Sequence, residues 1–272
     1  MLFQIPYKLR EWVDPDKLDW SMLSANSAAI HLLEQNPDKI DWFRLSGNPA
    51  AIRLLEQNPD KINWGIIARN PAAIHLLEQN PDKIDWSGLS RNSAAIHMLE
   101  QNPDKIDWYG LSLNSAAIHL LQQNPDKIKW TNLSINPNGH IILKNMPSKI
   151  KWDYLSSVEN AMYLLEQNPD KINWYTLSMN PAAIDLLVKN LSKIFFPYLC
   201  LNSAAIHLLE KYYLGMTKYH WEALSSNTSI FVYDYAAMRA ANAALKEEII
   251  RAAWHPRRVL AALESGADVE DL

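Results

Sequence analysis

The sequence predicts an all-α fold, an α-solenoid of stacked short helical hairpins with a 22-residue period and helical caps at both ends. The first observation is a tryptophan that returns every 22 residues from Trp20 to Trp174, after which Phe196 takes the ninth place. The second is the phrase Asn-Pro-Asp-Lys-Ile-Asp-Trp, which ends at Trp42 and recurs almost unchanged in the repeats that follow. A fixed internal period of this length is typical of repeat arrays that grow in one direction.

Four segments follow one another along the chain. Residues 1–13 match no repeat but are rich in apolar side chains, so we expect an N-terminal cap on the stack. Residues 14–210 hold about nine repeats of 22 residues. In residues 211–233 the next tryptophan, Trp221, arrives 25 residues after Phe196, which indicates an irregular joint and a degenerate tenth repeat. Residues 234–272 have a strongly helical pattern and predict a C-terminal helical cap.

Within one repeat, the residues predict two short helices. Asp41 is placed to cap the first helix, which begins at Trp42, and a leucine and a serine three and four residues later share the tryptophan's face. Asn48 is placed to cap the second helix, with a proline in its first position, where the missing N–H costs nothing. The second helix ends before the next proline, because Asn58 is pushed toward extended geometry. Each repeat is therefore expected to be a helical hairpin that is stable only when stacked.

A leucine-rich repeat is the main alternative fold, because it has a compatible length and the same Leu-Ser-x-Asn ending. In a leucine-rich repeat the residue two positions before that leucine lies on a strand and faces the core, so its type should be similar in all copies. The chain has Phe43, Gly65 and Tyr109 at this place, among other unrelated residues. The helical hairpin is therefore favoured.

One family resemblance rests on the repeat unit itself. The unit Trp-x-x-Leu-Ser-x-Asn-Pro-x-Ala-Ile-x-Leu-Leu-Glu-x-Asn-Pro-Asp-Lys-Ile, with Ile67 and Ala68 at the Leu-Ser places in its third copy, resembles short helical repeats in proteins of giant DNA viruses, the nucleocytoplasmic large DNA viruses. The end of the chain, from Trp254-His-Pro-Arg-Arg-Val259 to a Gly-Ala-Asp tail, is similar to an ending found in such proteins. The resemblance covers residues 14–272 and implies a viral origin and helical repeats, with no catalytic motif.

Charge and cysteine content limit the partners and the compartment. A net charge of -4 and a pI near 6.1 give no basic footprint for nucleic acid or an anionic membrane, so we expect neither partner. The single cysteine, Cys200, suits a reducing compartment. The start of the chain does not resemble a signal peptide, and no stretch of about 18 apolar residues follows. We expect a cytoplasmic protein, in the host cytoplasm if it is viral.

The recurring polar side chains could suggest chemistry. A histidine shares one place in the second helix of several repeats, as His97 and His119 do. Stacked helices lie about 8 to 10 Å apart, whereas zinc ligands bring their nitrogens within roughly 3.5 Å. We interpret these histidines as a solvated stripe, paired weakly with the glutamate three residues later. The recurring serine is replaced by Ala68 and Cys200, which indicates a limit on volume, and we interpret the tryptophans as core.

No catalytic residue, cofactor or metal is therefore expected, and the protein is not expected to be an enzyme. The variable places carry more information, because a place that changes freely among stacked copies is not fixed by the stack. These places are the two after the tryptophan and the one before the capping asparagine. The candidate partner-surface residues are Phe43, Arg44, Arg69, Arg91, Tyr109, Tyr154, Tyr175 and Tyr198.

Three functions remain open on the sequence alone. The first is a non-enzymatic scaffold that binds one or more proteins along an extended surface. The second is a nucleic-acid reader with one base per repeat, which the acidic charge disfavours. The third is an enzyme that uses the polar cluster beginning at Trp254 in the C-terminal segment.

Overall fold

The computed structural model describes residues 6–253 and confirms the all-α repeat fold. The chain forms two units. The repeat unit extends from Leu9 to Phe231, and the terminal unit combines, within the described part of the chain, residues 6–8 with residues 232–253.

Each repeat begins with a first helix of about one turn that starts, in the first eight repeats, at the recurring tryptophan. The first helices are α1 (Trp20–Ala25), α3 (Trp42–Ser46), α5 (Trp64–Ile67), α7 (Trp86–Ser90), α9 (Trp108–Leu111), α11 (Trp130–Leu133), α13 (Trp152–Leu155), α15 (Trp174–Leu177), α17 (Phe196–Leu199) and α19 (Lys218–Ser225). The second helices are α2 (Ile30–Gln35), α4 (Ile52–Gln57), α6 (Ile74–Gln79), α8 (Ile96–Gln101), α10 (Ile118–Gln123), α12 (His140–Leu143), α14 (Met162–Gln167), α16 (Ile184–Val188) and α18 (Ile206–Tyr212). The tenth repeat continues from α19 into a 3-10 turn, Thr228–Ile230, and then a strand.

The expected caps are present, and the turns are 3-10 helices. The Asp41 carboxylate accepts a hydrogen bond from the backbone N–H of Arg44 (3.2 Å) at the start of α3. The Asn48 side chain accepts one from the backbone N–H of Ala50 (3.0 Å) and caps a 3-10 turn that leads into α4. The Pro-Asp-Lys joint between repeats is a second 3-10 turn, as in Pro59–Lys61.

The core lies between the two helices of each repeat and its neighbours. The residue three places after the tryptophan is buried in every repeat, as Leu45 and Leu111 are, and a leucine of each second helix is fully buried opposite it. The tryptophans are less buried than their interpretation as core residues predicted. From Trp20 to Trp174 they are half-buried, whereas Trp221 is buried. The leucine fills the space between the helix layers, and the tryptophan ring lies in the groove toward the next joint.

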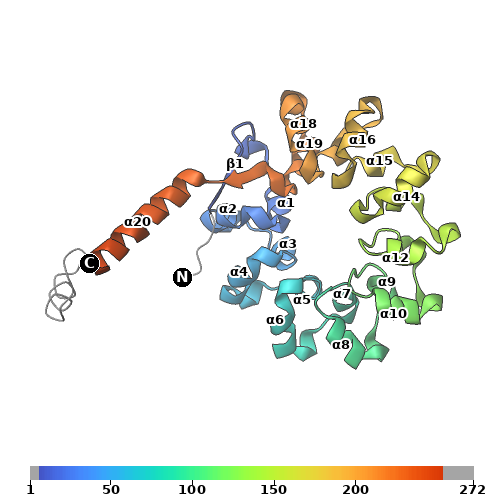
Figure 1. Cartoon of the computed structure of the whole chain (residues 1–272). Helices are drawn as coiled ribbons and strands as arrows, with labels where there is room; N and C mark the ends of the chain where they lie inside the picture. Colours follow the sequence, from blue (N-terminus) through green and yellow to red (C-terminus); the bar gives the residue numbers. More distant parts are fainter. Residues whose placement is uncertain (1–5, 254–272) are drawn as a thin grey trace, which may run out of the picture. The chain divides into compact units, whose positions relative to one another are not determined.

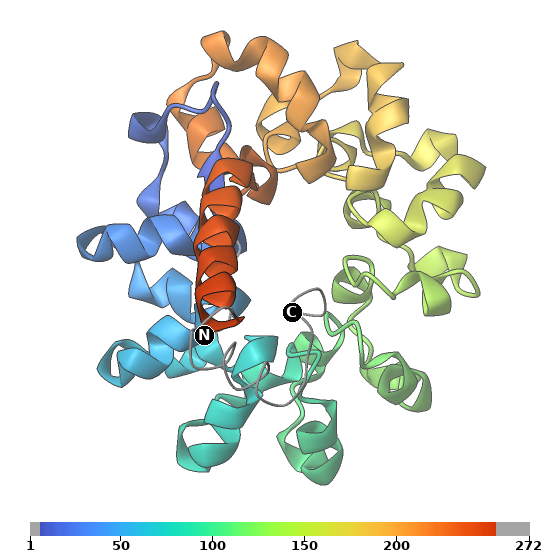
Figure 2. The same ribbon diagram turned by 60° about the vertical axis from the view of Figure 1, so that its left-hand side comes forward.

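The repeat unit is a closed ring, which the sequence analysis did not anticipate (Figures 1 and 2). Helix α19 contacts α17 on one side and α1 on the other, so the last repeat packs against the first. The first helices follow the inner side of the ring and the second helices its outer side (Figure 1). The first repeat therefore has the tenth as its neighbour. The expected role of residues 1–13 as an N-terminal cap stays a prediction, because residues 1–5 lie outside the described part of the chain. A constant small rotation between successive repeats sets the curvature of a solenoid. Here the accumulated rotation brings the array back to its start after ten first helices.

A ladder of buried asparagines connects neighbouring repeats. Asn114 is representative, since its Nδ2 donates to the backbone oxygens of Ser90 (3.1 Å) and Asn92 (2.9 Å) in the preceding repeat. Its Oδ1 accepts from the backbone N–H of Ala116 (3.0 Å). One asparagine therefore caps its own second helix and binds the repeat before it.

The asparagine ladder continues across the closure of the ring. Asn26 of the first repeat donates to the backbone oxygens of Ser225 (2.9 Å) and Asn227 (3.2 Å) of the tenth. The closing interface thus uses the same hydrogen bonds as the regular ones. In the seventh repeat Val158 stands at the asparagine's place, and its turn has no side-chain cap.

The recurring serine forms a second ladder, so a limit on volume does not fully explain it. The Ser90 hydroxyl donates to the backbone oxygen of Trp86 (2.8 Å) and accepts from the backbone N–H of Asp107 (3.0 Å) in the next repeat. At the closure the Ser225 hydroxyl accepts from the backbone N–H of Asp19 (2.8 Å). The hydroxyl satisfies buried backbone groups between repeats, and alanine or cysteine replaces it in two of them.

In the terminal unit, strand β1 (Tyr7–Leu9) pairs with β2 (Phe231–Tyr233), and the Tyr7 and Tyr233 rings lie 5.0 Å apart. Asp234 accepts hydrogen bonds from two backbone N–H groups at the start of α20 (Tyr235–Ala253). Helix α20 is longer than any repeat helix. The expected role of residues 234–272 as a cap stays a prediction, because part of that segment, including Trp254, lies outside the described residues.

Candidate partner-binding surface

The first-helix surface is the set of exposed side chains that directly follow the tryptophan, with their neighbours at the start and end of each first helix. The leucine and serine three and four places after the tryptophan are buried against the second helix. Since successive residues of a helix point in different directions, the residue directly after the tryptophan faces away from the second helix. Phe43 is 56% exposed and Tyr109 is 52% exposed, and Tyr154 and Tyr175 are also exposed. The first helices that carry these side chains follow the inner side of the ring (Figure 1).

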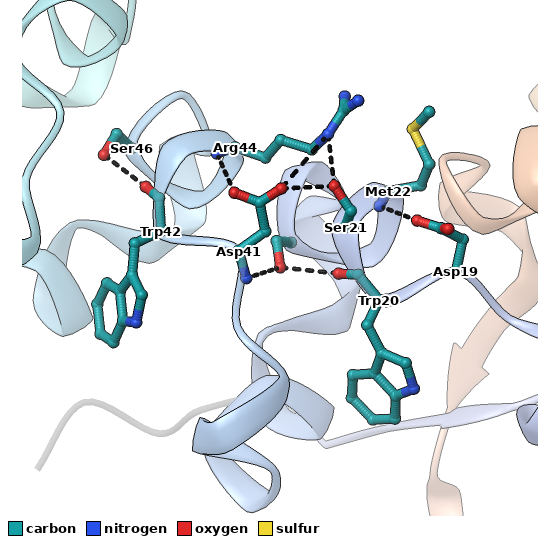
Figure 3. A network of polar contacts seen from close by, with 9 residues as sticks. Asp19, Trp20, Ser21, Met22, Asp41, Trp42, Arg44 and Ser46 are labelled. Atoms are coloured by element: carbon teal, nitrogen blue, oxygen red, sulfur yellow. Dashed lines mark hydrogen bonds and ion pairs between the residues drawn. The ribbon is translucent and has the colours of Figure 1, made fainter.

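A polar network connects the first two repeats on this surface (Figure 3). The Ser21 hydroxyl donates to Asp41 Oδ2 (2.5 Å) and accepts from Arg44 Nε (2.7 Å). Arg44 also lies 3.7 Å from the Asp41 carboxylate. Figure 3 shows Arg44 and Met22 on one side of the first helices and the tryptophans on the other. Arg44 is thus held by its neighbours and only half-exposed, while Phe43 beside it is exposed.

Repeats three to five bring a second group of the predicted residues together. The Arg91 guanidinium lies over the Tyr109 ring, 5.6 Å from the ring centre, in a cation–π arrangement. Its Nε is buried and has no hydrogen-bond partner among the described residues. Arg69, one repeat earlier, is exposed.

The densest part of the first-helix surface is an aromatic cluster in repeats eight and nine, made of Tyr175, Phe195 and Tyr198. The Tyr175 and Phe195 rings stack with centres 3.7 Å apart, and Tyr198 packs edge-on at 4.7 Å from Tyr175 and 5.3 Å from Phe195. The variable places of the repeat predicted the two tyrosines but not Phe195. Its signal was the departure from the pattern, because the place before the tryptophan needs a capping side chain, as Asp41 provides.

The second place after the tryptophan is less free than the sequence indicated. Gly88, Gly110 and Asn132 are buried there. A Cβ atom added to Gly88 would lie 2.9 Å from the backbone oxygen of Gly65, and one added to Gly110 would lie 2.9 Å from that of Ser87. In these repeats the first helix lies close to the backbone of the preceding repeat, so the available space limits which residue fits at this place.

Three of the histidines form hydrogen bonds between repeats. His75 lies 2.9 Å from Glu56, His97 3.2 Å from Glu78, and His119 2.9 Å from Glu100, each pair joining two successive second helices. For these three histidines the expected pairing with the glutamate three residues later is wrong, because the preceding repeat places a carboxylate closer. His31 does interact electrostatically with Glu34, three residues later, as expected. The described residues contain no group of three or more side chains suited to hold a metal ion.

Burial raises the pKa of the Cys200 thiol to about 12, so this cysteine remains a protonated packing residue at neutral pH. None of the helices in residues 6–253 is long and apolar enough to cross a membrane. No protein-family model, curated protein or solved structure matches the chain.

Proposed function

We propose that the protein is a non-enzymatic scaffold, of viral origin, that binds one or more partner proteins through the first-helix surface. The aromatic cluster of Tyr175, Phe195 and Tyr198 is the observation that carries this proposal. The fold does not require these side chains, since other repeats have serine, glycine or threonine at the place of Tyr175. Tyr175 is exposed, and Phe195 and Tyr198, which are half-buried, pack against its ring and hold it in place. A partly exposed aromatic cluster that is pre-ordered in this way is suited to be a binding hot spot.

The remaining exposed side chains fit the same function. Phe43, Tyr109 and Tyr154 continue the aromatic character around the ring, and Arg69 supplies a long cationic side chain beside them. Aromatic residues and arginine are enriched in protein interfaces, whereas nucleic-acid interfaces require a dense basic surface. The net charge of -4 favours a protein partner.

The test is affinity purification of the tagged full-length protein from cells that produce it, comparing three forms. The wild type should retain a defined set of proteins, and a variant with Tyr109, Tyr154 and Tyr175 changed to alanine should lose them. Tyr163→Ala is the matched control, because Tyr163 is exposed but lies on a second helix, α14. Equal recovery by all three forms would contradict the proposal. Recovery of RNA in place of protein, with a steep dependence on salt, would support the nucleic-acid alternative.

A further inference from the structure

An apolar cavity opens between the ninth and tenth repeats. This ninth groove has a volume of about 440 Å³ and is lined by Leu191, Ile194, Phe196, Leu208, Tyr212 and Gly215, among others. None of its lining residues is a lysine, arginine, aspartate or glutamate, and His220 is the one histidine among them. The volume is within the range of about 300 to 1,000 Å³ that is usual for binding pockets.

The repeats provide an internal comparison for this cavity. The same groove four repeats earlier is lined by Glu100, Pro103, Trp108 and Lys127, among others, and the Lys127 ammonium lies 4.6 Å from the Trp108 ring centre. A lysine stem and its charge thus cover the aromatic ring. In the ninth groove Phe196 takes the place of the tryptophan and Gly215 the place of the lysine.

The covering lysine is a general feature of the grooves. Nine of the ten joints end in lysine, and the ninth groove's joint ends in Gly215. The observed lysine–tryptophan pairs are Lys39 with Trp20, Lys83 with Trp64, Lys127 with Trp108, Lys149 with Trp130, Lys193 with Trp174 and, at the closure of the ring, Lys17 with Trp221. The ninth groove lacks the lysine that covers the aromatic ring of its counterparts. The counterparts beside Trp108 and Trp221 are cavities of about 370 and 440 Å³, so the ninth groove differs from them in its apolar lining and not in its volume.

One side chain gives the ninth groove a hydrogen-bond donor. His220 Nδ1 accepts from the backbone N–H of Thr217 (3.0 Å) and lies 3.2 Å from the Thr217 hydroxyl. Because a backbone N–H can only donate, Nδ1 carries no proton, and the neutral ring has its proton on Nε2. Burial lowers the pKa of His220 and favours this neutral form. The ring packs edge-on against Phe196 at 5.0 Å, which holds its orientation.

The surroundings of the ninth groove indicate what size of molecule covers it. Two lining residues at its mouth, Leu191 and Tyr212, are 56% and 55% exposed and form its apolar rim. Leu214 and Tyr219, which adjoin the lining residues Gly215 and His220 in the sequence, are exposed as well. A small ligand inside the cavity would leave this apolar rim in water. A polypeptide covers the cavity and its rim together.

We propose that the ninth groove binds a bulky apolar side chain, such as leucine or phenylalanine, presented by a peptide segment of a partner protein. A backbone oxygen of that segment accepts a hydrogen bond from His220 Nε2. This inference rests on the proposed function, since it assumes a protein partner, but it names a second binding place. The apolar lining replaces Pro103, Lys127 and Asn124 of the regular groove by Leu191, Gly215 and Tyr212.

The test uses a displayed library of random 12-residue peptides, selected on the full-length protein, and compares the dissociation constants of enriched peptides. The deciding variant is Gly215→Lys, which restores the covering lysine. A Cβ at Gly215 meets no atom within 4 Å, so the variant should fold. Enriched peptides should share a leucine or phenylalanine, and Gly215→Lys should weaken their binding at least tenfold. Changing the shared residue to alanine should have a similar effect.

Other outcomes overturn the inference in distinguishable ways. Peptides that bind Gly215→Lys as tightly as the wild type, but not a Tyr175→Ala/Tyr198→Ala variant, would refute the ninth groove and leave the proposed function intact. The absence of any enriched peptide would refute the groove alone, since the affinity purification tests the function separately. A wild-type dimer that Gly215→Lys dissociates, measured by sedimentation, would show that a second copy of this chain occupies the groove.

Discussion

Closure of the ring can be tested with one asparagine at the closing interface and an equivalent one far from it. In the structure, Asn26→Ala and Asn114→Ala remove the same three hydrogen bonds, two to backbone oxygens of the adjoining repeat and one to the helix that the asparagine caps. Both asparagines are almost fully buried. In a closed ring the two substitutions should therefore cost similar free energies of unfolding.

The magnitude follows from what each substitution leaves behind. Loss of the cap costs about 1 kcal/mol. The Ser225 backbone oxygen then lacks its side-chain donor, and a buried acceptor without a partner costs about 1 to 3 kcal/mol. The Asn227 oxygen still accepts from the backbone N–H of Ile230, so its loss is smaller. Asn26→Ala should lower the free energy of unfolding by about 2 to 4 kcal/mol in total.

An open array gives a different result for one variant only. If α1 did not contact α19, Asn26 would have only its capping role, and Asn26→Ala would cost about 1 kcal/mol. Urea denaturation of the wild type, Asn26→Ala and Asn114→Ala measures the two costs side by side. A cost near 1 kcal/mol for Asn26→Ala, beside 2 to 4 kcal/mol for Asn114→Ala, would refute the closed ring.

Amide hydrogen exchange gives an independent reading of the same interface. The backbone N–H of Asp19 donates to the Ser225 hydroxyl (2.8 Å), as that of Asp107 donates to Ser90 (3.0 Å). In a closed ring the two amides should be protected to a similar degree. Fast exchange of Asp19 beside slow exchange of Asp107 would show that the ring is open in solution.

Three further predictions concern single residues. Val158→Asn should raise the free energy of unfolding by about 1 kcal/mol in urea denaturation, because it restores the missing cap of its repeat; no gain would contradict the ladder. Gly88→Ala should lower the free energy of unfolding by about 1 to 2 kcal/mol, since its Cβ would lie 2.9 Å from the backbone oxygen of Gly65. Gly65→Ala should be neutral or stabilising, because the nearest atom to its Cβ would be 3.6 Å away. Equal effects of the two substitutions would refute the steric argument. Burial lowers the pKa of His220, so the contribution of its neutral ring to the free energy of unfolding should be fully present above the ordinary pKa of 6.5 and should decrease as the pH falls below it. The difference between the urea midpoints at pH 7.5 and pH 5.5 should therefore be smaller in His220→Gln than in the wild type.

Much of each repeat could be predicted from its residues, because the signals are local. Asp41 and Asn48 cap helices where the sequence placed the caps, and the joint proline begins a turn. The exposure of Phe43 and Tyr109 also followed from the pattern, since nothing constant occupies their place in other repeats. The burial of Gly110 did not, because it depends on how closely one backbone approaches the next.

The ring could not be predicted with the same rules, although its closing residues are visible in the sequence. The tenth repeat keeps the serine and asparagine of the pattern as Ser225 and Asn227, and the first joint keeps its lysine as Lys17. In an open array Lys17 would have no aromatic ring to cover, but in the ring it lies 5.4 Å from the Trp221 ring centre. Whether the ends meet depends on the rotation between repeats, which accumulates over the whole array and is set by packing.

The closed ring also bears on where the pattern can change. A repeat inside the ring has a neighbour on both sides: the asparagine side chain, such as Asn92, binds the repeat before it, and the serine hydroxyl, such as that of Ser90, binds the repeat after it. The joint between the ninth and tenth repeats is three residues longer than the others, and it is there that Gly215 replaces the lysine and the apolar cavity opens. The aromatic cluster lies in the repeats just before it, at Tyr175, Phe195 and Tyr198. Both candidate binding places therefore lie in the part of the ring where the repeat sequence departs from its own pattern, while Asn227 still maintains the asparagine ladder there.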